Sequence, residues 1–510
     1  MNRSRRFLVL SLLTALTTRA DVVLAPLFTD HAVLQRDKPV PVWGTADTGE
    51  KIAVTFHGQT REALAGTDGR WIVYLDQLAA DAQGADLVAA GKNTLTLHDI
   101  VVGEVWLCSG QSNMEFTVSR ATNAAKEIAA ANFPLIRQVK IERAVAATPA
   151  DTVKTSGWQA ASPQTVGEFT AVGYFFARDI FQKLGVPVGL VHSSWGGTPV
   201  ESWMSPAALA SDPAFKVVGE RWTQALADYP EKKAAFDSAL ATWTKAEAAT
   251  TTQSATARAA WLKQNPKPRA PRGPGDQWTP TGLFNGMINP LLPYALRGAL
   301  WYQGESNAER AAEYHALFAA MITAWRAHFG QGDFPFYWVN LANYKNPTDK
   351  TGTTYAFLRE AQTLTLDLPN TGQALAIDVG NPDDIHPTNK QDVGHRLALL
   401  AKNRLYGATG DDTGPTFSSL TREGTALRIR FTHAAEGLIA HDKPVQSLEL
   451  AGPDKVFHPA TAKILRDTLL VSASGVTDPV AVRYAWKNSP EANLFNGAGL
   501  PAVPFRSDNW

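Results

Sequence analysis

Short apolar runs alternate with amphipathic stretches through the middle of the chain, and this alternation constrains the fold more than any other feature. The runs lie at residues 104–108, 186–192, 297–302, 334–341 and 373–378. Their length and continuous apolar character are typical of strands buried on both faces of a sheet. Strands that alternate with helices predict a mostly parallel sheet with helices on both faces.

Amphipathic helices are predicted over residues 174–184, 313–329 and 390–406, and each is followed directly by a glycine. In the second helix, apolar side chains recur at helical spacing and form one stripe: Tyr314, Leu317, Phe318, Met321, Ile322 and Trp325. Glycine readily adopts the left-handed conformation that ends a helix. We therefore expect an α/β domain over residues 101–410.

Both ends of the chain are rich in short β-type runs, such as "KIAVTFHG" and "ALRIRFTH". Their spacing predicts β-rich segments over residues 21–100 and 411–510, either as separate domains or as two halves of one sandwich. Within the α/β part, residues 206–276 interrupt the alternation with an Ala-rich helical stretch followed by "KQNPKPRAPRGPG". We interpret this stretch as an insertion that serves as a lid or as a packing appendage.

Polar and reactive residues follow four of the five predicted strands, in the segments "SGQSNM", "SSWGGTPVESW", "QGESN" and "DVGNPDDIHP". In an open parallel sheet, ligands bind beyond the carboxyl ends of the strands. The sequence therefore places a candidate site where these four loops meet.

The residues of these loops fit acyl transfer by a serine nucleophile. Ser112 would attack a carbonyl carbon and His386 would accept its proton. An aspartate beside the histidine, Asp383 or Asp384, would orient the ring. His192 is an alternative base, but no carboxylate lies near it in the sequence before Glu201.

The carbonyl oxygen acquires negative charge during such a reaction, so hydrogen-bond donors must already point at it. The candidate donors are the backbone amides of Ser112, Gly196 and Gly197 and a side-chain amide from Gln303 or Asn307. The glycine pair would allow the backbone to approach a substrate closely, because glycine has no Cβ.

Taken in order, "GEVWLCSGQSNM", "SSWGGTPVESW", "WYQGESNA", "LREAQ" and "DIHPTNKQDVGHRLA" resemble the sialate O-acetylesterase family, secreted carbohydrate esterases of the SGNH hydrolase superfamily. The resemblance runs from "FTDHAVLQRDKPVPVWGTA" to "NLFNGAGLPAVPFRSD". It implies an SGNH-like α/β domain in which Ser112 is the nucleophile and His386 the base. It also implies an oxyanion hole made by the Ser112 amide, the glycine pair and the "QGE" loop.

The resemblance leaves the third member of the triad open. The Asp-x-x-His spacing of the superfamily favours Asp383, whereas similar sequences often keep the aspartate of "DIHP", which is Asp384. The chain also departs from the plain SGNH pattern, because Gln111 replaces the Asp of the Gly-Asp-Ser motif and Gln303 stands where an Asn is usual.

An acetylated sugar is the substrate that the resemblance implies, either a sialic acid or a plant-wall polysaccharide such as xyloglucan or xylan. The chain has 15 tryptophans, a residue type that stacks on sugars. Those in or near the motifs are Trp195, Trp203, Trp301 and Trp486. A catalytically inactive sugar-binding protein is a further alternative, although the serine, the histidine and both aspartates are present.

Five residues around the expected nucleophile are assigned to the substrate-binding region: Gln111, Asn113, Trp195, Glu305 and Asn307. Gln111 and Asn113 are also expected to shape the nucleophile loop. We expect Glu305 to be a buried, hydrogen-bonded support rather than a catalytic acid.

No metal or cofactor is expected, because the sequence has no Cys/His cluster and no Gly-rich phosphate loop after a strand. A rival interpretation is a metal-dependent hydrolase with Asp378, Asp383, Asp384 and His386 as ligands. The 48 basic residues equal the 48 acidic ones, so neither nucleic acid nor a membrane surface is an expected partner. The sequence predicts no particular oligomeric state.

Residues 1–20 place three arginines before an apolar run that is too short to span a membrane. This pattern predicts a signal peptide and a secreted or periplasmic protein with no membrane anchor after its removal. The chain has a single cysteine, Cys108, so an internal disulfide is impossible.

Overall fold

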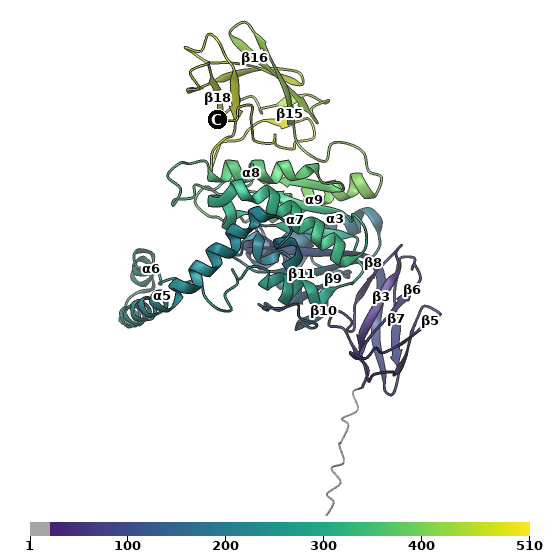
Figure 1. Cartoon of the computed structure of the whole chain (residues 1–510). Helices are drawn as coiled ribbons and strands as arrows, with labels where there is room; N and C mark the ends of the chain where they lie inside the picture. The colour runs from purple at the N-terminus through teal and green to yellow at the C-terminus, as the bar shows by residue number, and fades with distance from the viewer. Residues whose placement is uncertain (1–20) are drawn as a thin grey trace, which may run out of the picture.

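A computed structural model describes residues 21–510 as an α/β body with one β-rich unit at each end (Figure 1). The predicted signal peptide, residues 1–20, lies outside the described residues. Across the described part, no helix is both long and apolar enough to cross a bilayer.

The central sheet has the strand order β10-β9-β11-β8-β12-β13-β14. Six of these strands are parallel, and β10 at the edge is antiparallel to β9. The bounds are Thr94–Gly110 (β8), Phe133–Ile141 (β9), Thr155–Ala161 (β10), Val188–Ser194 (β11), Gly298–Tyr302 (β12), Phe336–Asn340 (β13) and Thr371–Leu375 (β14). The predicted α/β class is therefore confirmed, and every predicted apolar run overlaps a strand of this sheet.

Helices cover both faces of the sheet. On one face α3 (Ala171–Leu184) packs against α9 (Lys390–Leu405), and on the other α7 (Ala311–Phe329) packs against α8 (Thr354–Leu364). Side chains of β12 alternate between the two cores: Trp301 joins the core under α7, and Leu300 joins the core under α3 and α9. Glycines in the left-handed conformation follow α3 and α7, as expected for these helix ends.

The N-terminal unit is joined to the body by β8, a strand of 17 residues. Its first part pairs with β2 (Val33–Gln35) and β7 (Asp81–Ala90), and its last part lies in the central sheet. The unit also contains β1 (Val23–Leu24), β3 (Val40–Thr45), β4 (Lys51–Phe56), β5 (Gln59–Leu64) and β6 (Arg70–Leu75). The predicted boundary between residues 100 and 101 thus falls inside one continuous strand.

The C-terminal unit lies at the opposite end of the molecule (Figure 1) and has its own core. One sheet has the order β15-β16-β21-β20 and another β19-β18-β22-β24, and β17 pairs with β23. The bounds are Thr416–Glu423 (β15), Ala426–Thr432 (β16), Leu438–Ile439 (β17), Leu448–Ala451 (β18), Phe457–Pro459 (β19), Thr461–Leu465 (β20), Thr468–Ser472 (β21), Ala481–Tyr484 (β22), Phe495–Asn496 (β23) and Phe505–Arg506 (β24). Within residues 21–510, no strand of this unit pairs with the N-terminal unit, so the two ends do not complete one sheet.

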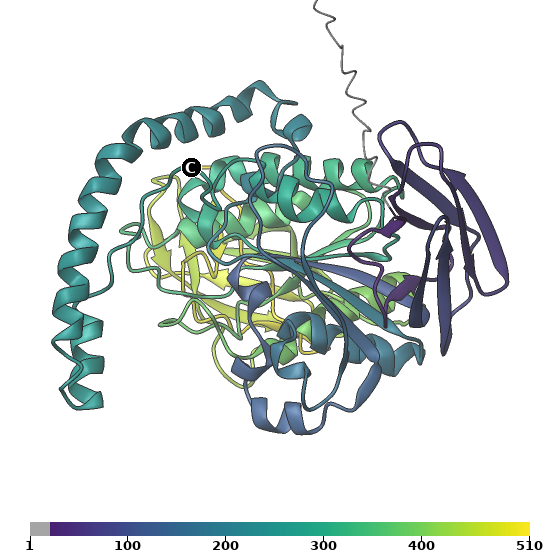
Figure 2. The same ribbon diagram turned by 90° about the horizontal axis from the view of Figure 1, so that it is seen from below.

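The predicted insertion forms a helical arm made of α4 (Pro206–Leu209), α5 (Lys216–Ala248) and α6 (Ala255–Gln264). Figure 2 shows α5 running along one side of the body, with α6 folded back beside its far end. Across residues 216–248, Val218 alone is buried. The arm therefore contacts the body mainly at its base.

Candidate active site

The nucleophile turn is pressed between two strands at the carboxyl edge of the central sheet. Gly110, the last residue of β8, is in register with Ser194 of β11 and Tyr302 of β12. Gly110 has φ +131°, and a Cβ there would lie 2.3 Å from the Tyr302 carbonyl oxygen. Only glycine fits this position, and the chain then turns to place Ser112 at the start of α1 (Ser112–Glu115).

Ser112 and His386 are in direct contact, with Oγ 2.8 Å from the Nε2 atom of the ring. On the other side of the ring, Asp384 Oδ1 lies 3.6 Å from Nδ1. The same carboxylate oxygen accepts the His386 backbone N–H at 2.9 Å. The structure therefore brings Ser112, His386 and Asp384 together in one row.

Asp383, which the Asp-x-x-His spacing favoured, is turned away from this row. Its carboxylate accepts a hydrogen bond from Lys345 Nζ at 2.7 Å, and its side chain is 76% exposed. Asp384 instead folds back on the backbone two residues ahead, a turn that short acidic side chains commonly make. This local turn, which spacing alone does not reveal, places Asp384 beside the ring.

Burial lowers the pKa of His386 below its ordinary value. The carboxylate of Asp384 opposes this shift, whereas the positive charges of Lys390 and Arg120 add to it. The ring is therefore neutral near pH 7 and can accept a proton from the serine.

A buried polar cluster lies beneath the serine and the histidine. Asn113 Oδ1 accepts a hydrogen bond from Lys390 Nζ at 2.6 Å. Its Nδ2 donates to Glu305 Oε1 at 2.6 Å and to the carbonyl of Ile385 at 3.0 Å. Asn113, the residue after Ser112, is thus hydrogen-bonded to Ile385, the residue before His386.

Burial shifts the pKa of both ionisable members of this cluster. It lowers the pKa of Lys390 to about 7 and raises the pKa of Glu305. The ammonium lies over the rings of Phe116 and Tyr302, which partly replace its lost hydration. Glu305 and Asn113, which we assigned to the substrate-binding region, therefore lie in a support beneath the site, as we expected for Glu305.

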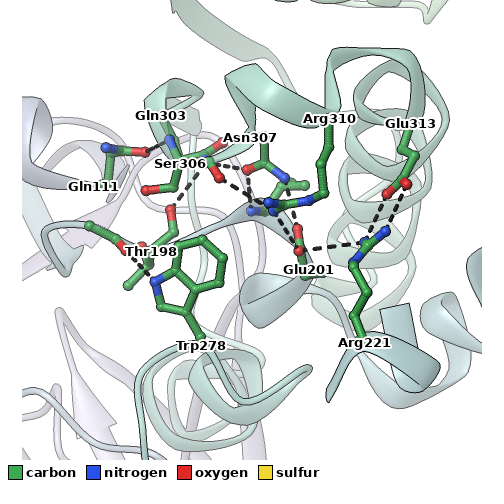
Figure 3. A network of polar contacts seen from close by, with 12 residues as sticks. Gln111, Thr198, Glu201, Arg221, Trp278, Gln303, Ser306, Asn307, Arg310 and Glu313 are labelled. Carbon is green, nitrogen blue, oxygen red and sulfur yellow. Dashed lines mark hydrogen bonds and ion pairs between the residues drawn. The ribbon is translucent and has the colours of Figure 1, made fainter. Parts of the chain in front are cut away.

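Two of the expected oxyanion donors are already engaged elsewhere. The Gly196 N–H donates to Glu115 Oε2 at 3.0 Å. The amide nitrogen of Gln303 donates to the Thr198 carbonyl at 3.1 Å and to Asn307 Oδ1 at 2.7 Å (Figure 3). The assignment of Gly196 and Gln303 as donors is thus not supported by this geometry.

The backbone N–H groups of Ser112 and Gly197 have no acceptor among residues 21–510. Gly196 lies directly against the nucleophile, since a Cβ there would be 3.2 Å from Ser112 Cβ. A free N–H on the serine itself, and one on the glycine that follows the residue in contact with the serine, are suited to hold an oxygen that becomes negative during the reaction.

Gln111 and Asn307 connect loops rather than face open space. Gln111 Oε1 accepts the N–H groups of Gly304 and Ser306 at 3.3 and 3.4 Å. Asn307 is buried, and its Nδ2 donates to Glu201 Oε2 at 2.8 Å. Both residues were assigned to the substrate-binding region, and both instead hold the "QGE" loop against its neighbours.

Among the four motif tryptophans, all within residues 21–510, Trp195 alone is partly exposed. The Arg143 guanidinium lies 5.5 Å from its ring centre. Trp203, Trp301 and Trp486 are buried in the cores. Trp195 is therefore the one motif tryptophan that a ligand can reach.

The remaining candidates do not join the row of Ser112 and His386. His192 is buried, contacts Ser194 Oγ at 2.6 Å, and has its pKa lowered to about 3 by burial. Both carboxylate oxygens of Asp378 are bound by Arg396, at 2.6 and 2.7 Å. Among residues 21–510, no group of three or more His, Cys, Asp or Glu side chains is arranged to hold a metal ion.

The motif "LREAQ" carried no assigned role, and the structure gives it one. Gln362 of α8 donates to the Gln303 carbonyl at 3.1 Å and so holds the "QGE" loop from behind. Lys390 was also missed, because a lysine in the first turn of an amphipathic helix normally lies in solvent. The only hint was its place inside the motif "DIHPTNK".

The chain is similar in sequence to a known family of enzymes. A family model described as carbohydrate esterase, sialic acid-specific acetylesterase, matches residues 102–257 and 275–402. The sialate O-acetylesterase of Rattus norvegicus is 29% identical over 93% of this chain and 92% of its own length. The sialate O-acetylesterase of Homo sapiens is 27% identical over 94% of this chain and 91% of its own.

A solved structure also matches closely. The crystal structure of a carbohydrate acetylesterase from Xanthomonas citri has 39% sequence identity and a TM-score of 0.80. The match covers 96% of this chain and 100% of that chain.

Proposed function

The chain belongs to the sialic acid-specific acetylesterase family of carbohydrate esterases and is a carbohydrate O-acetylesterase, and from this premise we propose that Ser112, His386 and Asp384 form its catalytic triad. The observation that carries the proposal is the 2.8 Å contact between Ser112 Oγ and His386 Nε2. Asp384 is proposed as the third member because its carboxylate, and not that of Asp383, lies beside His386 Nδ1.

In the first half of the reaction, Ser112 Oγ forms a bond to the acetyl carbonyl carbon while its proton moves to His386 Nε2. The carbonyl oxygen becomes negative and accepts hydrogen bonds from the N–H groups of Ser112 and Gly197. The bond between the carbonyl carbon and the sugar oxygen then breaks, and the sugar oxygen takes the proton from His386. The sugar leaves with a free hydroxyl, and Ser112 stays acetylated.

In the second half, a water molecule gives its proton to His386 Nε2 and attacks the acetylated Ser112. Collapse of that intermediate releases acetate and returns the proton to the serine oxygen. Asp384 stabilises the charged ring in both halves, because its carboxylate lies on the Nδ1 side.

Turnover of 4-nitrophenyl acetate tests the nucleophile. Ser112→Ala should reduce kcat about 10⁴-fold or more, because no other group in the row can take the acetyl group. A fluorophosphonate should label the native protein and not the variant. Equal rates for the two proteins would end the assignment of Ser112.

Paired variants test the aspartate. Asp384→Asn should lower kcat strongly, whereas Asp383→Asn should leave it nearly unchanged, because Asp383 is paired with Lys345 on the surface. The reverse ranking would transfer the role to Asp383.

We propose an acetylated sialic acid as the substrate. The curated relatives are named sialate O-acetylesterases, and Arg120 offers a cation for the sugar carboxylate. Its guanidinium lies 4.4 Å from the centre of the Phe116 ring, its charge acts on His386, and it has no carboxylate partner within residues 21–510. Of the other cations beside the site, Arg143 and Lys345 are paired with carboxylates, and Lys390 is buried beneath it.

Acetate release from acetylated sialic acid, xylan and xyloglucan tests this choice. Arg120→Met should reduce the sialate rate and leave that of 4-nitrophenyl acetate nearly unchanged. Release from xylan or xyloglucan with none from sialic acid would favour the plant-wall alternative.

We also propose that the protein is exported, to the periplasm or the medium. Three arginines followed by an apolar run in residues 1–20 support this. N-terminal sequencing of the protein from the periplasm should give a chain that begins near residue 21. Recovery from the cytoplasm with residues 1–20 intact would contradict the proposal.

A further inference from the structure

The turn over residues 195–198 has all four of its carbonyl oxygens bound by side chains. The pairs are Trp195 with Thr198 Oγ1 at 2.8 Å, Gly196 with Gln277 Nε2 at 3.1 Å, Gly197 with Trp278 Nε1 at 2.6 Å and Thr198 with Gln303 Nε2 at 3.1 Å. Two of these donors, Gln277 and Trp278, lie where the chain returns from the helical arm. The arm therefore ends in two side chains that hold the glycine turn.

Holding the Gly196 carbonyl also sets the direction of the next N–H. The carbonyl of Gly196 and the N–H of Gly197 belong to one trans peptide unit, so they point in opposite directions. Gln277 on the oxygen side thus turns the N–H away from the arm. That N–H has no acceptor among the described residues, and Gly196 lies against Ser112.

Gly197 needs this external support because its own backbone is permissive. It has φ +71°, and glycine in this region can move to other conformations at little cost. A donor that must stay within a few tenths of an ångström of its place needs neighbours that fix it.

We propose that Gln277 and Trp278 are positioning residues that hold the Gly197 amide in place as an oxyanion donor. The helical arm is then a fixed brace of the site rather than a lid. This inference rests on the proposed function, because it assumes that Ser112 attacks an ester carbonyl.

The return segment is itself held rigidly. Trp278 lies under the Arg272 guanidinium, 4.0 Å from the ring centre, and Arg310 lies 5.4 Å away. Asp276 accepts the Trp278 N–H at 2.8 Å and pairs with Arg272 at 3.3 Å. The packing of these four residues fixes the indole N–H against the glycine turn.

Helix α5 supports the return segment from outside. Gly273 lies flat against Tyr229 of α5, since a Cβ there would be 2.1 Å from a ring carbon. Near its base, α5 is tied to the body by Arg221, which donates to both oxygens of Glu313 at 2.7 and 2.8 Å. Both ends of the arm are thereby anchored close to the site.

Figure 3 shows how these anchors reach the "QGE" loop. Arg310 donates to Glu201 at 3.0 Å, and Glu201 accepts from Asn307 at 2.8 Å. Asn307 in turn accepts from Gln303, whose amide holds the Thr198 carbonyl. The glycine turn is thus braced from the arm and from the "QGE" loop.

Two variants test the proposal on 4-nitrophenyl acetate, a substrate with almost no sugar contacts. Gln277→Leu removes one donor at nearly constant volume, and Trp278→Phe removes the indole N–H but keeps a ring between the arginines. We expect each to lower kcat about 10- to 100-fold with KM nearly unchanged, because a displaced donor weakens only the transition state. If one variant does not fold, the other carries the test.

Matched controls lose the same kind of hydrogen bond far from the turn. Trp243→Phe removes an indole N–H that binds the Asn265 carbonyl inside the arm at 2.8 Å. Gln446→Leu removes an amide that binds the Pro444 carbonyl in the C-terminal unit at 3.1 Å. Both controls should keep the native kcat and a similar Tm.

A boronic acid, which forms a tetrahedral adduct with an active serine, supplies a readout that a general loss of structure would not give. Its affinity should fall by about the same factor as kcat/KM in the two test variants. Native kcat in both variants, or an equal loss in the controls, would overturn the inference. If the inference fails in this way while Ser112→Ala is inactive, the proposed triad still stands. If Ser112→Ala is active, the proposed function itself is wrong.

Discussion

The charged groups on either side of Asn113 fix the orientation of its side-chain amide. The oxygen faces the ammonium of Lys390, and the nitrogen faces the carboxylate of Glu305. Rotating the amide would bring like partial charges together, so the side chain has one favourable state. Because Asn113 follows Ser112 in the chain and binds the carbonyl before His386, this state fixes the two reacting side chains relative to each other.

Removing the Asn113 amide should cost both stability and rate. Asn113→Leu leaves Lys390 Nζ and Glu305 Oε1 without this partner in a buried place, so we expect the free energy of unfolding in urea to fall by about 2–4 kcal/mol. We also expect kcat to fall, since the serine and histidine lose their common support. Asn493→Leu, which removes a half-buried amide that binds Gln446 and Pro444 in the C-terminal unit, should leave kcat unchanged.

The pH dependence of kcat/KM should report the charges around His386. The base must be neutral to act, so the rate is lost as the pH falls through its pKa. Lys390 lowers this pKa and Asp384 raises it. Lys390→Met should therefore move the acid limb to higher pH, and Asp384→Asn should move it to lower pH. Shifts in the opposite directions would contradict this electrostatic account.

At the scale of elements, α8 connects the site to the C-terminal unit. Arg359 is buried and donates to the carbonyls of Leu341 and Ala342 in the body at 2.7 and 2.9 Å. It also donates to the carbonyls of Lys487 and Asn488 in the C-terminal unit at 2.8 and 2.9 Å. One turn along the same helix, Gln362 holds the "QGE" loop, so the motif "LREAQ" is a structural link.

Arg359→Met should therefore weaken the junction. It leaves the carbonyl oxygens of Leu341, Ala342 and Lys487 without a donor and removes one of the two donors to the Asn488 carbonyl, which we expect to cost about 3–5 kcal/mol in the free energy of unfolding. Hydrogen exchange should rise at residues 486–488 as well as in α8. Arg422→Met, which alters an exposed ion pair within the C-terminal unit, should leave exchange at both places unchanged.

Elements with a clear hydrophobic period were predictable from the sequence, and those with buried polar groups were not. Strand β9 was missed because its buried positions include Arg137 and Gln138, which interrupt the apolar pattern. The same limit applied to the site. Ser112 and His386 could be predicted from their motifs. The choice of Asp384 depended on a local turn, and the use of Lys390 depended on burial that only the packed structure creates.

At the scale of the whole molecule, the two β-rich units relate differently to the body. One apolar core runs without interruption from Val22 through the N-terminal unit to Ala361 of α8, whereas the C-terminal unit has a separate core. A shared core couples the stability of its parts, and separate cores allow separate unfolding.

Calorimetry should therefore resolve two unfolding transitions rather than three. The N-terminal unit and the α/β body should unfold together, and residues 411–510 should unfold in the other transition. Limited proteolysis near the first transition identifies which part has opened. A separate transition for residues 21–93 would contradict the shared core.

Strand β8 also limits how this protein can be recombined with its relatives. It begins in the N-terminal unit and ends at Gly110, two residues before Ser112. A chimera joined at the apparent border of the two units would cut through this strand and shift the register of the nucleophile. Exchange of the N-terminal unit between family members is therefore expected to succeed only when all of β8 travels with it, so inheritance of the unit and of the serine is linked.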